Sequence, residues 1–566
     1  MRISVLEGSR AEEFLFDEDA ERAWRDLLDA CPWSTVYQDV PFVRTWCETY
    51  RDEWEPVVVL GGSVEDGLDG LLPLARARGD GRLVPLGGRE AEYQGWITRP
   101  GEAEDFPRKA LHEVNGRFPG RDLVFRYLPP ATPLQWLDKG GNGFRWSATE
   151  WMRPLVRDPA HRADKSLRKK SNKSRLKQMA RHGEVKLDRI RDGAELRGLL
   201  AQLASWCDLR HGAWHGALPF ERDALKGPFL CSLLDAGVLH GSVLTVGGEP
   251  ASIYLGCLGR GTMHLGVIAH TPFLAKYSPG RFHLYLLARM LGEEEVPVLD
   301  MTPGEDPYKE RFADSFDGVR ELTVHGGLSS FLRDRCAARA RKVARKALER
   351  AGVEPERVKA FLARARRVRP SSIPAELVRR MRHRLWRDAE YRIYFYDLAA
   401  NRPEPGGEEV EADSIPAVLS YRPEEAWQTR EAFLRQTIKA LENGHHIYTV
   451  SDAEGLVHYG WVCKESEGTF ATEVGQEIRF PRKSHSLWNS YTAPRGRGKK
   501  LYQKTMRQTL YDLRAKGCDG RVYAGVLSDN HASRHVVEKV GFTYERSAFE
   551  RVRFGRTTRW QEDPPE

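Results

Sequence analysis

One pattern of strands and tight turns occurs three times along the chain, and it limits the possible fold more than any other feature. Each copy alternates short apolar runs with turns rich in Gly, Asp or Glu, which predicts three consecutive strands. The copies span residues 55–88, 239–270 and 445–474. Strands joined by such short turns pair in antiparallel order. We therefore expect an α+β chain of three related domains, each a mostly antiparallel twisted sheet flanked by helices.

The length of 566 residues suits three domains of ordinary size. We predict domains over residues 1–150, 151–330 and 386–566, with a basic helical linker over 331–385. Residues 331–390 hold 19 Lys or Arg against 7 Asp or Glu. A linker of solvated helices is the simplest interpretation, while a contact with nucleic acid or with an acidic membrane surface stays open.

A second basic run, "DKSLRKKSNKSRLKQMARHGEV", spans residues 164–185. Its apolar spacing predicts one helix with Leu167, Leu176 and Met179 on or near one face. Its cations form a solvated face, or they steer an anionic carrier such as tRNA or a nucleotide sugar.

Bulk composition places few limits on the partner. The net charge of +8 permits an anionic partner without requiring one. The eight cysteines include no C-x-x-C pair, which argues against a disulfide framework and a zinc site, so we expect no metal and a reducing cytoplasm. No stretch approaches the roughly 18 apolar residues of a membrane span, and the N-terminus lacks the apolar segment of a secretory signal.

The stretch "YTAPRGRGKKLYQ" at residues 491–503 is the most specific functional motif. A strand is predicted before it and a helix after it, over residues 499–517. A turn of little side-chain bulk at a helix start exposes backbone N–H groups, which bind an anion and most readily a phosphate.

The chain continues with a predicted strand at 521–530 and the short helix "NHASRHVVEKVGF" at 530–542. Strand, R-x-x-G-x, helix, strand, N-x-x-S, helix resembles the acetyl-CoA site of the GNAT superfamily of N-acetyltransferases. The resemblance implies an acyl-CoA substrate and three GNAT-like domains. It implies that the pyrophosphate binds the turn and that Asn530 and Ser533 contact the pantetheine arm. The cofactor-binding residues it implies are Thr492, Arg495, Gly496, Arg497, Gly498, Lys499, Lys500, Asn530 and Ser533.

Two positions depart from the family pattern. Lys500 stands where the family has Gly or Ala, so it either crowds the turn or adds a phosphate contact. Val537 stands where the family often has a Tyr as general acid, and Tyr544 is nearby but out of register. Either solvent protonates the leaving thiolate, or the acyl transfer takes place elsewhere in the chain.

Direct attack of an amine on a thioester needs a group that accepts the proton of the amine. Glu473, Glu477 and His485 precede or lie on the predicted fourth strand of the last domain, so all three are candidates. Their spacing does not single one out.

Farther upstream, "VPVLDMTPGEDPYKERFADSF" at 296–316 predicts a buried strand that ends at Asp300 and a turn that presents Tyr308 and Lys309. With "LPL" at 72–74, "LGGREAEYQG" at 86–95, "LRKKSNKSRLKQMARHGEV" at 167–185 and "YSPGRFHLYLL" at 277–287, it resembles the CelD-like acetyltransferases encoded with bacterial cellulose and exopolysaccharide genes. It is also distantly similar to FemABX peptidyltransferases.

This second resemblance covers roughly residues 35–322. It implies that Asp300, Tyr308 and Lys309 line a substrate site, where a Lys holds a phosphate or an oxyanion. The first domain has no glycine turn into a helix, so we interpret it as a degenerate copy that shapes the acceptor cleft.

Together these features predict a cytoplasmic acyl-CoA-dependent N-acyltransferase that acts on an amine, with an amino sugar or glycan precursor in exopolysaccharide synthesis as acceptor. An aminoacyl-tRNA-dependent transferase like FemABX and a non-catalytic CoA-binding scaffold are the alternatives.

Overall fold

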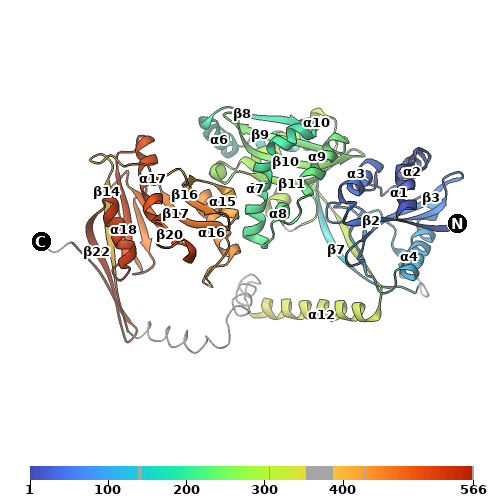
Figure 1. Cartoon of the computed structure of the whole chain (residues 1–566). Coiled ribbons are helices and arrows are strands. Elements are labelled where there is room, and N and C mark those ends of the chain that lie inside the picture. The colour runs from blue at the N-terminus through green and yellow to red at the C-terminus, as the bar shows by residue number, and fades with distance from the viewer. Residues whose placement is uncertain (138–142, 305, 352–385, 426, 564–566) are drawn as a thin grey trace. The chain divides into compact units, whose positions relative to one another are not determined.

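The structure, a computed structural model, describes residues 1–137, 143–304, 306–351, 386–425 and 427–563. The chain divides into two compact units, and Figure 1 shows their elements coloured along the chain. Unit 1 comprises Met1–Cys207 with Pro219–Ala351, and unit 2 comprises Asp208–Leu218 with Gly352–Glu566.

Unit 1 begins with a small antiparallel sheet in the order β1-β2-β3-β4, with β5 paired to β3. Val57, Val59, Leu72 and Leu74 are fully buried on its strands, so this sheet has its own apolar core. The strands are β1 (Ile3–Glu7), β2 (Trp54–Ser63), β3 (Gly67–Ala77), β4 (Leu83–Pro85) and β5 (Ile97–Thr98).

The second sheet of unit 1 has eight strands in the order β6-β13-β7-β12-β11-β10-β9-β8. All neighbouring pairs are antiparallel except β11 and β12, which are parallel. The strands are β6 (Leu123–Leu128), β7 (Arg145–Val156), β8 (Val185–Ile190), β9 (Leu239–Val246), β10 (Glu249–Gly259), β11 (Thr262–His270), β12 (Val298–Asp300) and β13 (Ser315–His325).

Strand β6 belongs to this second sheet although it precedes residue 150, and the predicted domain limit at 150 falls inside β7. Strand β13 lies between β6 and β7 and pairs with both. The second sheet of unit 1 therefore includes β6 and the start of β7, which the predicted limits place in the first domain.

The helices of unit 1 are mainly amphipathic and cover these sheets. Leu284, Leu287 and Leu291 of α10 pack with Met263 and Leu299 of the second sheet. The helices are α1 (Ser9–Phe16), α2 (Glu18–Ala30), α3 (Val40–Tyr50), α4 (Asp105–Arg117), α5 (Pro159–Leu167), α6 (Lys170–Met179), α7 (Gly193–His215, shared with unit 2), α8 (Pro219–Arg222), α9 (Lys226–Asp235), α10 (Pro279–Glu293), α11 (Pro307–Phe312) and α12 (Leu328–Ala351).

Unit 2 is built on an eight-stranded sheet in the order β15-β16-β17-β20-β21-β14-β22-β23, in which only β20 and β21 are parallel. A separate two-stranded sheet holds β18 and β19. The strands are β14 (Trp386–Asp397), β15 (Glu411–Ala412), β16 (His445–Asp452), β17 (Gly455–Cys463), β18 (Gly468–Ala471), β19 (Gln476–Arg479), β20 (His485–Thr492), β21 (Arg521–Leu527), β22 (Thr543–Arg553) and β23 (Arg556–Glu562).

Helix α17 of unit 2 presents Met506, Leu510 and Leu513 to a buried core with Val522 and Val537. This apolar stripe at helical spacing drives the helix onto the sheet. The described helices of unit 2 are α15 (Ile415–Leu419), α16 (Arg430–Glu442), α17 (Leu501–Ala515) and α18 (His531–Val540).

The α+β prediction with mostly antiparallel sheets is confirmed. The third strand of the 445–474 pattern was placed wrongly, because β18 leaves the main sheet and pairs with β19. The helix predicted over 164–185 is interrupted, because Lys169 has an extended conformation (φ −61°, ψ 132°) between α5 and α6. In the predicted linker, α12 is one continuous helix (Figure 1); residues 352–385 lie outside the described part of the chain.

Within the described part of the chain, no helix combines the length and the apolar content that crossing a membrane requires.

Candidate active sites

The parallel strands β20 and β21 of unit 2 pair over three residues only. The pairs are His485 with Val522, Ser486 with Tyr523 and Leu487 with Ala524. Strand β20 then continues to Thr492 without further pairing to β21. The edges of both strands beyond the last pair therefore carry backbone groups that no strand of this pair satisfies, which is a suitable place for an extended ligand.

Strand β20 also contains an irregularity at the point of separation. Tyr459 of β17 pairs with Tyr491, and Trp461 pairs with Trp488, so two residues of β20 face Gly460 alone. One of them, Asn489, has a positive φ of 46°. This arrangement is a β-bulge, which redirects backbone groups and is common beside active sites.

The glycine turn lies directly after β20 and ends at α17. Its N–H groups of Gly498, Lys500 and Leu501 donate no hydrogen bond to any other described residue. Lys500, in the left-handed conformation (φ 60°, ψ 19°), is the N-cap residue of α17. Free N–H groups at a helix start are suited to hold a phosphate.

The two glycines of the turn have different roles. A Cβ at Gly496 would lie 2.5 Å from Cγ2 of Val457, so this glycine permits close packing of the turn on the sheet. Gly498 has a φ of 82° and open space around its Cα. Gly496 therefore fixes the position of the turn, whereas Gly498 leaves its outer side free for a ligand.

The arginine side chains of the turn are held by carboxylates rather than directed to a ligand. Arg495 forms ion pairs with Glu424 and, at 3.2 Å, with Asp452. Arg497 lies 3.2 Å from Glu425. Lys499 and Lys500 are exposed. The groups of this turn that are not held by carboxylates are therefore its backbone N–H groups and the two lysines.

The second half of the motif forms the start of α18. The side chain of Asn530 accepts a hydrogen bond from the N–H of Ser533 at 3.1 Å, so it caps the helix. Val537 is fully buried in the core beneath the helix. The hydroxyl of Tyr544 is 2.8 Å from that of Ser547.

The three residues predicted as general bases lie in different places. His485 is buried in the first parallel pair, where burial, then the charge of Lys464, lowers its pKa. Glu473 is half-buried in the turn between β18 and β19, and its charge contributes to raising the pKa of Tyr391 after the larger effect of burial. The side chain of Glu477 is 67% exposed. The structure does not bring the three together.

Unit 1 repeats the strand arrangement of unit 2. Strands β11 and β12 pair in parallel over three residues, and the last pair is His264 with Asp300. Strand β12 ends there, while β11 continues to His270. The following helix α10 also has an N-cap residue in the left-handed conformation, Ser278 (φ 59°, ψ 56°).

A buried polar network surrounds this last pair. Oδ2 of Asp300 lies 3.0 Å from Nδ1 of His264 and accepts a hydrogen bond of 2.7 Å from the hydroxyl of Tyr93. Nη1 of Arg153 is 3.3 Å from the same oxygen, and the other guanidinium nitrogens of Arg153 donate to Asp317 at 2.6 and 2.7 Å. Tyr93 and Asp300 are fully buried, and His264 is 3% exposed.

The network keeps Asp300 ionised. Burial alone would raise its pKa, but the hydrogen bond with His264, the charge of Arg153 and the hydrogen bond from Tyr93 outweigh it, so the pKa lies below its ordinary value. Burial raises the pKa of Tyr93, which keeps its hydroxyl a donor.

Of the residues predicted in unit 1, Asp300 and Lys309 are connected through one turn. Asp300 Oδ1 accepts from the N–H of Thr302 at 2.7 Å, and Nζ of Lys309 is 3.4 Å from the carbonyl of Thr302 and 3.3 Å from its hydroxyl. Lys309 is buried, whereas Tyr308 is 37% exposed and has no part in the network.

The sequence did not indicate His264 or Arg153 as functional, and Tyr93 stood in the motif at 86–95 without an assigned role. Tyr93 lies between β4 and β5, and 207 residues separate it from its partner Asp300. The available signal was a polar residue inside an apolar strand, as His264 is in "TMHLGVIAH". A polar residue in an apolar strand does not by itself indicate a functional site, because its hydrogen-bond partners are not known from the sequence.

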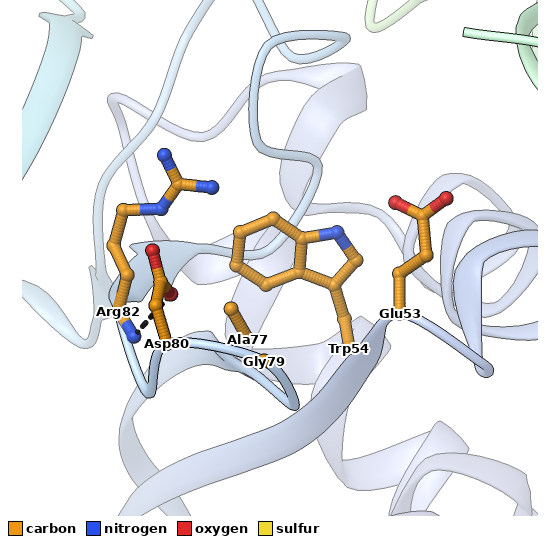
Figure 2. A pocket seen from close by; sticks show the side chains of 6 residues that line it. All are labelled: Glu53, Trp54, Ala77, Gly79, Asp80 and Arg82. Carbon is orange, nitrogen blue, oxygen red and sulfur yellow. Dashed lines mark hydrogen bonds between the residues drawn. The ribbon is translucent and has the colours of Figure 1, made fainter.

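Unit 1 also has a surface pocket, and none of its lining residues belongs to this network. Figure 2 shows the pocket with Trp54 and Arg82 among its lining residues. The guanidinium carbon of Arg82 lies 5.4 Å from the centroid of the Trp54 ring. Its other lining residues are Glu53, Ala77, Gly79 and Asp80. None of the predicted site residues is among them.

Two family models match the chain. The model described as "Acetyltransferase (GNAT) domain" matches residues 165–310, and that described as "Acetyltransferase (GNAT) family" matches residues 418–542. The first range contains β11, α10 and β12, and the second contains β20, α17 and β21. The chain therefore contains two GNAT domains. It is an acyltransferase, and GNAT domains generally use acyl-CoA as donor.

Solved structures and curated proteins add little to this assignment. A conserved protein of unknown function from Bacteroides thetaiotaomicron VPI-5482 is 11% identical, with a TM-score of 0.38 over 54% of this chain and 97% of its own. The C-terminal domain of a putative lysylphosphatidylglycerol synthetase from Agrobacterium fabrum is 12% identical (TM-score 0.36; 57% and 95%). FemX is 10% identical, with a TM-score of 0.37 over 53% of this chain and 95% of its own. No curated protein matches the chain.

Proposed function

We propose that unit 2 of this GNAT protein is an acyl-CoA-dependent N-acyltransferase. The observation that carries the proposal is the separation of β20 from β21 directly before a turn with free N–H groups. An extended acyl-pantetheine arm would lie along the unpaired edge of β20, and its pyrophosphate would lie at the start of α17.

Each predicted cofactor-binding residue has a defined part in this proposal. The N–H groups of Gly498, Lys500 and Leu501 hold the pyrophosphate, and the exposed Lys499 and Lys500 add charge. Arg495 and Arg497 act through their backbone and anchor the turn to acidic residues. Thr492, Gly496, Asn530 and Ser533 shape the strand end, the turn and the helix start that flank the pantetheine arm.

In the proposed reaction the amine nitrogen attacks the thioester carbonyl, a C–N bond forms and the C–S bond breaks. The amine gives up a proton, and the leaving thiolate gains one. Glu473 is the proton acceptor that we favour among the three predicted, because Glu477 is exposed and His485 lies in the paired part of the strands. Since Val537 is apolar and buried, solvent protonates the thiolate.

The acceptor class and location are also part of the proposal. An amino sugar or glycan precursor in exopolysaccharide synthesis is supported by the CelD-like sequence motifs of unit 1. A cytoplasmic location is supported by the scattered cysteines and by the acyl-CoA donor.

The aminoacyl-tRNA alternative has one observation in its favour. Helix α6 and the residues before it carry exposed cations in close succession, and only Arg168 among them has an ion-pair partner among the described residues, Asp164 at 3.9 Å. The exposed cations are Lys165, Arg168, Lys169, Lys170, Lys173 and Lys177. Binding of tRNA that weakens steeply with salt would support this alternative, and acetyl-CoA binding with no transfer to any amine would support a scaffold.

The test is calorimetric titration of acetyl-CoA into the full chain and into Gly498→Glu. A carboxylate at this position would repel the pyrophosphate, so we expect the affinity of the unit 2 site to fall by about 100-fold or more. Gly517→Glu is a matched control, since Gly517 also has a positive φ (81°) and open space but lies at the other end of α17. Equal affinity in both variants would contradict the proposed site.

A further inference from the structure

Unit 1 has the same strand separation as unit 2, but the hydrogen-bonded pair of His264 with Asp300 stands where unit 2 has Leu487 and Ala524. We propose that unit 1 holds a second acyl-transfer centre, in which His264 is the general base for an N–H or O–H acceptor and Asp300 is its positioning residue. This centre shares only the acyl-thioester donor with the site proposed in unit 2.

The position of Asp300 determines which nitrogen of His264 can act. Nδ1 faces the Asp300 carboxylate at 3.0 Å. A carboxylate at this distance holds the proton on Nδ1 and leaves Nε2 as the ring nitrogen with a free lone pair. The same contact stabilises the imidazolium that forms when Nε2 accepts a proton.

Asp300 is itself fixed from several sides, so it can orient His264. Tyr93 and Arg153 approach Oδ2, and the N–H of Thr302 binds Oδ1. A fully buried carboxylate with this many donors is costly to build and has little freedom to move. A purely structural role would be filled at lower cost by an apolar pair such as that of unit 2.

The surroundings of the pair suit an acyl donor. His264 is the residue at which parallel pairing ends, as Leu487 is in unit 2. Helix α10 begins at Pro279 after the left-handed Ser278, whose hydroxyl accepts a hydrogen bond of 3.0 Å from Arg175, and Arg281 in its first turn is exposed. Two cations thus accompany a helix start that follows the separated strand, one from α6 and one from the first turn of α10.

In the proposed step, Nε2 of His264 carries the proton from the acceptor to the leaving thiolate. The acceptor nitrogen or oxygen forms a bond to the thioester carbonyl carbon while its proton passes to Nε2 of His264. The C–S bond then breaks, and the proton passes from Nε2 to the leaving thiolate. The products are the acylated acceptor and the free thiol, and His264 returns to its neutral form.

Aromatic and charged groups surround His264. Tyr37 and Tyr93 contact the ring of His264, and Cys257 is its neighbour on β10. Glu92 is half-buried nearby, where burial raises its pKa and the charges of Arg126 and Lys309 oppose this. The remaining charged groups are Asp300, Arg153 and Asp317.

The test uses the full-length Gly498→Glu protein, in which the unit 2 site is disabled. Acetyl-CoA hydrolysis without acceptor is measured as thiol release, with water as the nucleophile that His264 deprotonates. We expect residual hydrolysis that His264→Gln lowers at least tenfold. His240→Gln is the control, because His240 is equally buried on β9 outside the network. We expect that control to hydrolyse acetyl-CoA at the same rate as the Gly498→Glu protein.

Asp300→Asn is the second variant, and it keeps an oxygen near Nδ1 while removing the charge. We expect it to lower kcat for thiol release with little change in the KM for acetyl-CoA, because the imidazolium that forms during the step loses its counter-charge. Unchanged kcat values in folded His264→Gln and Asp300→Asn proteins would overturn the proposal, as would complete loss of hydrolysis in Gly498→Glu alone. If Gly498→Glu keeps full acetyl-CoA affinity at every site, the unit 2 proposal fails instead.

Discussion

The two GNAT regions of this chain share a backbone arrangement and differ in the side chains at its central point. In unit 2 the last parallel pair is Leu487 with Ala524, and in unit 1 it is His264 with Asp300. In both, a helix follows whose N-cap residue has a positive φ near 60°. Backbone geometry therefore does not fix the chemistry, because the residues at one register position decide whether the opening is apolar or ionic.

The turns before these helices differ as well. The turn of unit 2 has two glycines, a free N–H at Gly498 and no proline at the helix start. Helix α10 of unit 1 begins with Pro279, which has no N–H. Unit 2 is therefore better suited to hold a pyrophosphate through its backbone, and the centre proposed in unit 1 would rely more on cations such as Arg281.

The largest effect is expected from removing the charge at the pair of unit 1. Asp300→Ala leaves Arg153, His264 and Tyr93 without their shared acceptor, and we expect unit 1 to lose about 3–5 kcal/mol of stability. Leu487→Ala in unit 2 removes a half-buried apolar side chain and should cost about 1–2 kcal/mol. Urea unfolding with hydrogen exchange resolved by peptide measures each unit. Equal costs would show that the two pairs contribute alike.

The substitution Val537→Tyr tests whether a tyrosine at this position could serve unit 2 as a general acid. Val537 is fully buried beneath α18, so Val537→Tyr should overpack the core and cost about 1–3 kcal/mol. We expect no increase in thiol release from acetyl-CoA. A stable variant with faster turnover would show instead that the position is open to the thiolate.

The two glycines of the turn give a matched comparison. In Gly496→Ala the new methyl group meets Val457 at 2.5 Å, and we expect a loss of about 1–3 kcal/mol with weaker acetyl-CoA binding because the turn must move. Gly498→Ala meets no neighbour and should cost about 1 kcal/mol through its positive φ. Thermal unfolding and calorimetry check both, and the reverse order would contradict the roles assigned to these glycines.

The smallest effect is expected at the helix caps. Lys500→Gly and Ser278→Gly relieve a left-handed conformation that side chains disfavour, so each should stabilise its unit by up to about 1 kcal/mol. Ser278→Gly also removes the hydroxyl that Arg175 contacts, so its gain should be the smaller. A loss of stability in Lys500→Gly would mean that the lysine makes a stabilising contact in solution.

Much of the fold was predictable from local patterns. Alternating apolar residues and glycine turns predicted β2–β3–β4, β9–β10–β11 and β16–β17, because these strands pair with their neighbours in sequence. The third pattern went wrong at β18, since nothing local distinguishes pairing with β17 from pairing with β19. The break at Lys169 between α5 and α6 was missed because lysine is otherwise a good helix former.

The site of unit 2 was predicted more fully than that of unit 1. Residues 491–503 hold strand end, turn and helix start in one continuous stretch, so sequence alone predicted the turn and its place between strand and helix. Anion binding by this turn stays a prediction. What the sequence left undecided is where side chains point, as with Arg495 and its ion pairs to Glu424 and Asp452.

Tertiary structure alone decided the ionic centre of unit 1. Its members come from β7, the segment between β4 and β5, β11 and β12, and no local pattern links them. Sequence indicated Asp300 and Lys309, but the partners Tyr93, Arg153 and His264 were set by which strands lie next to each other. The physical reason is that a buried charge is tolerated only where the folded chain supplies its counter-charges and hydrogen bonds, and these are fixed by long-range strand pairing rather than by neighbours in sequence.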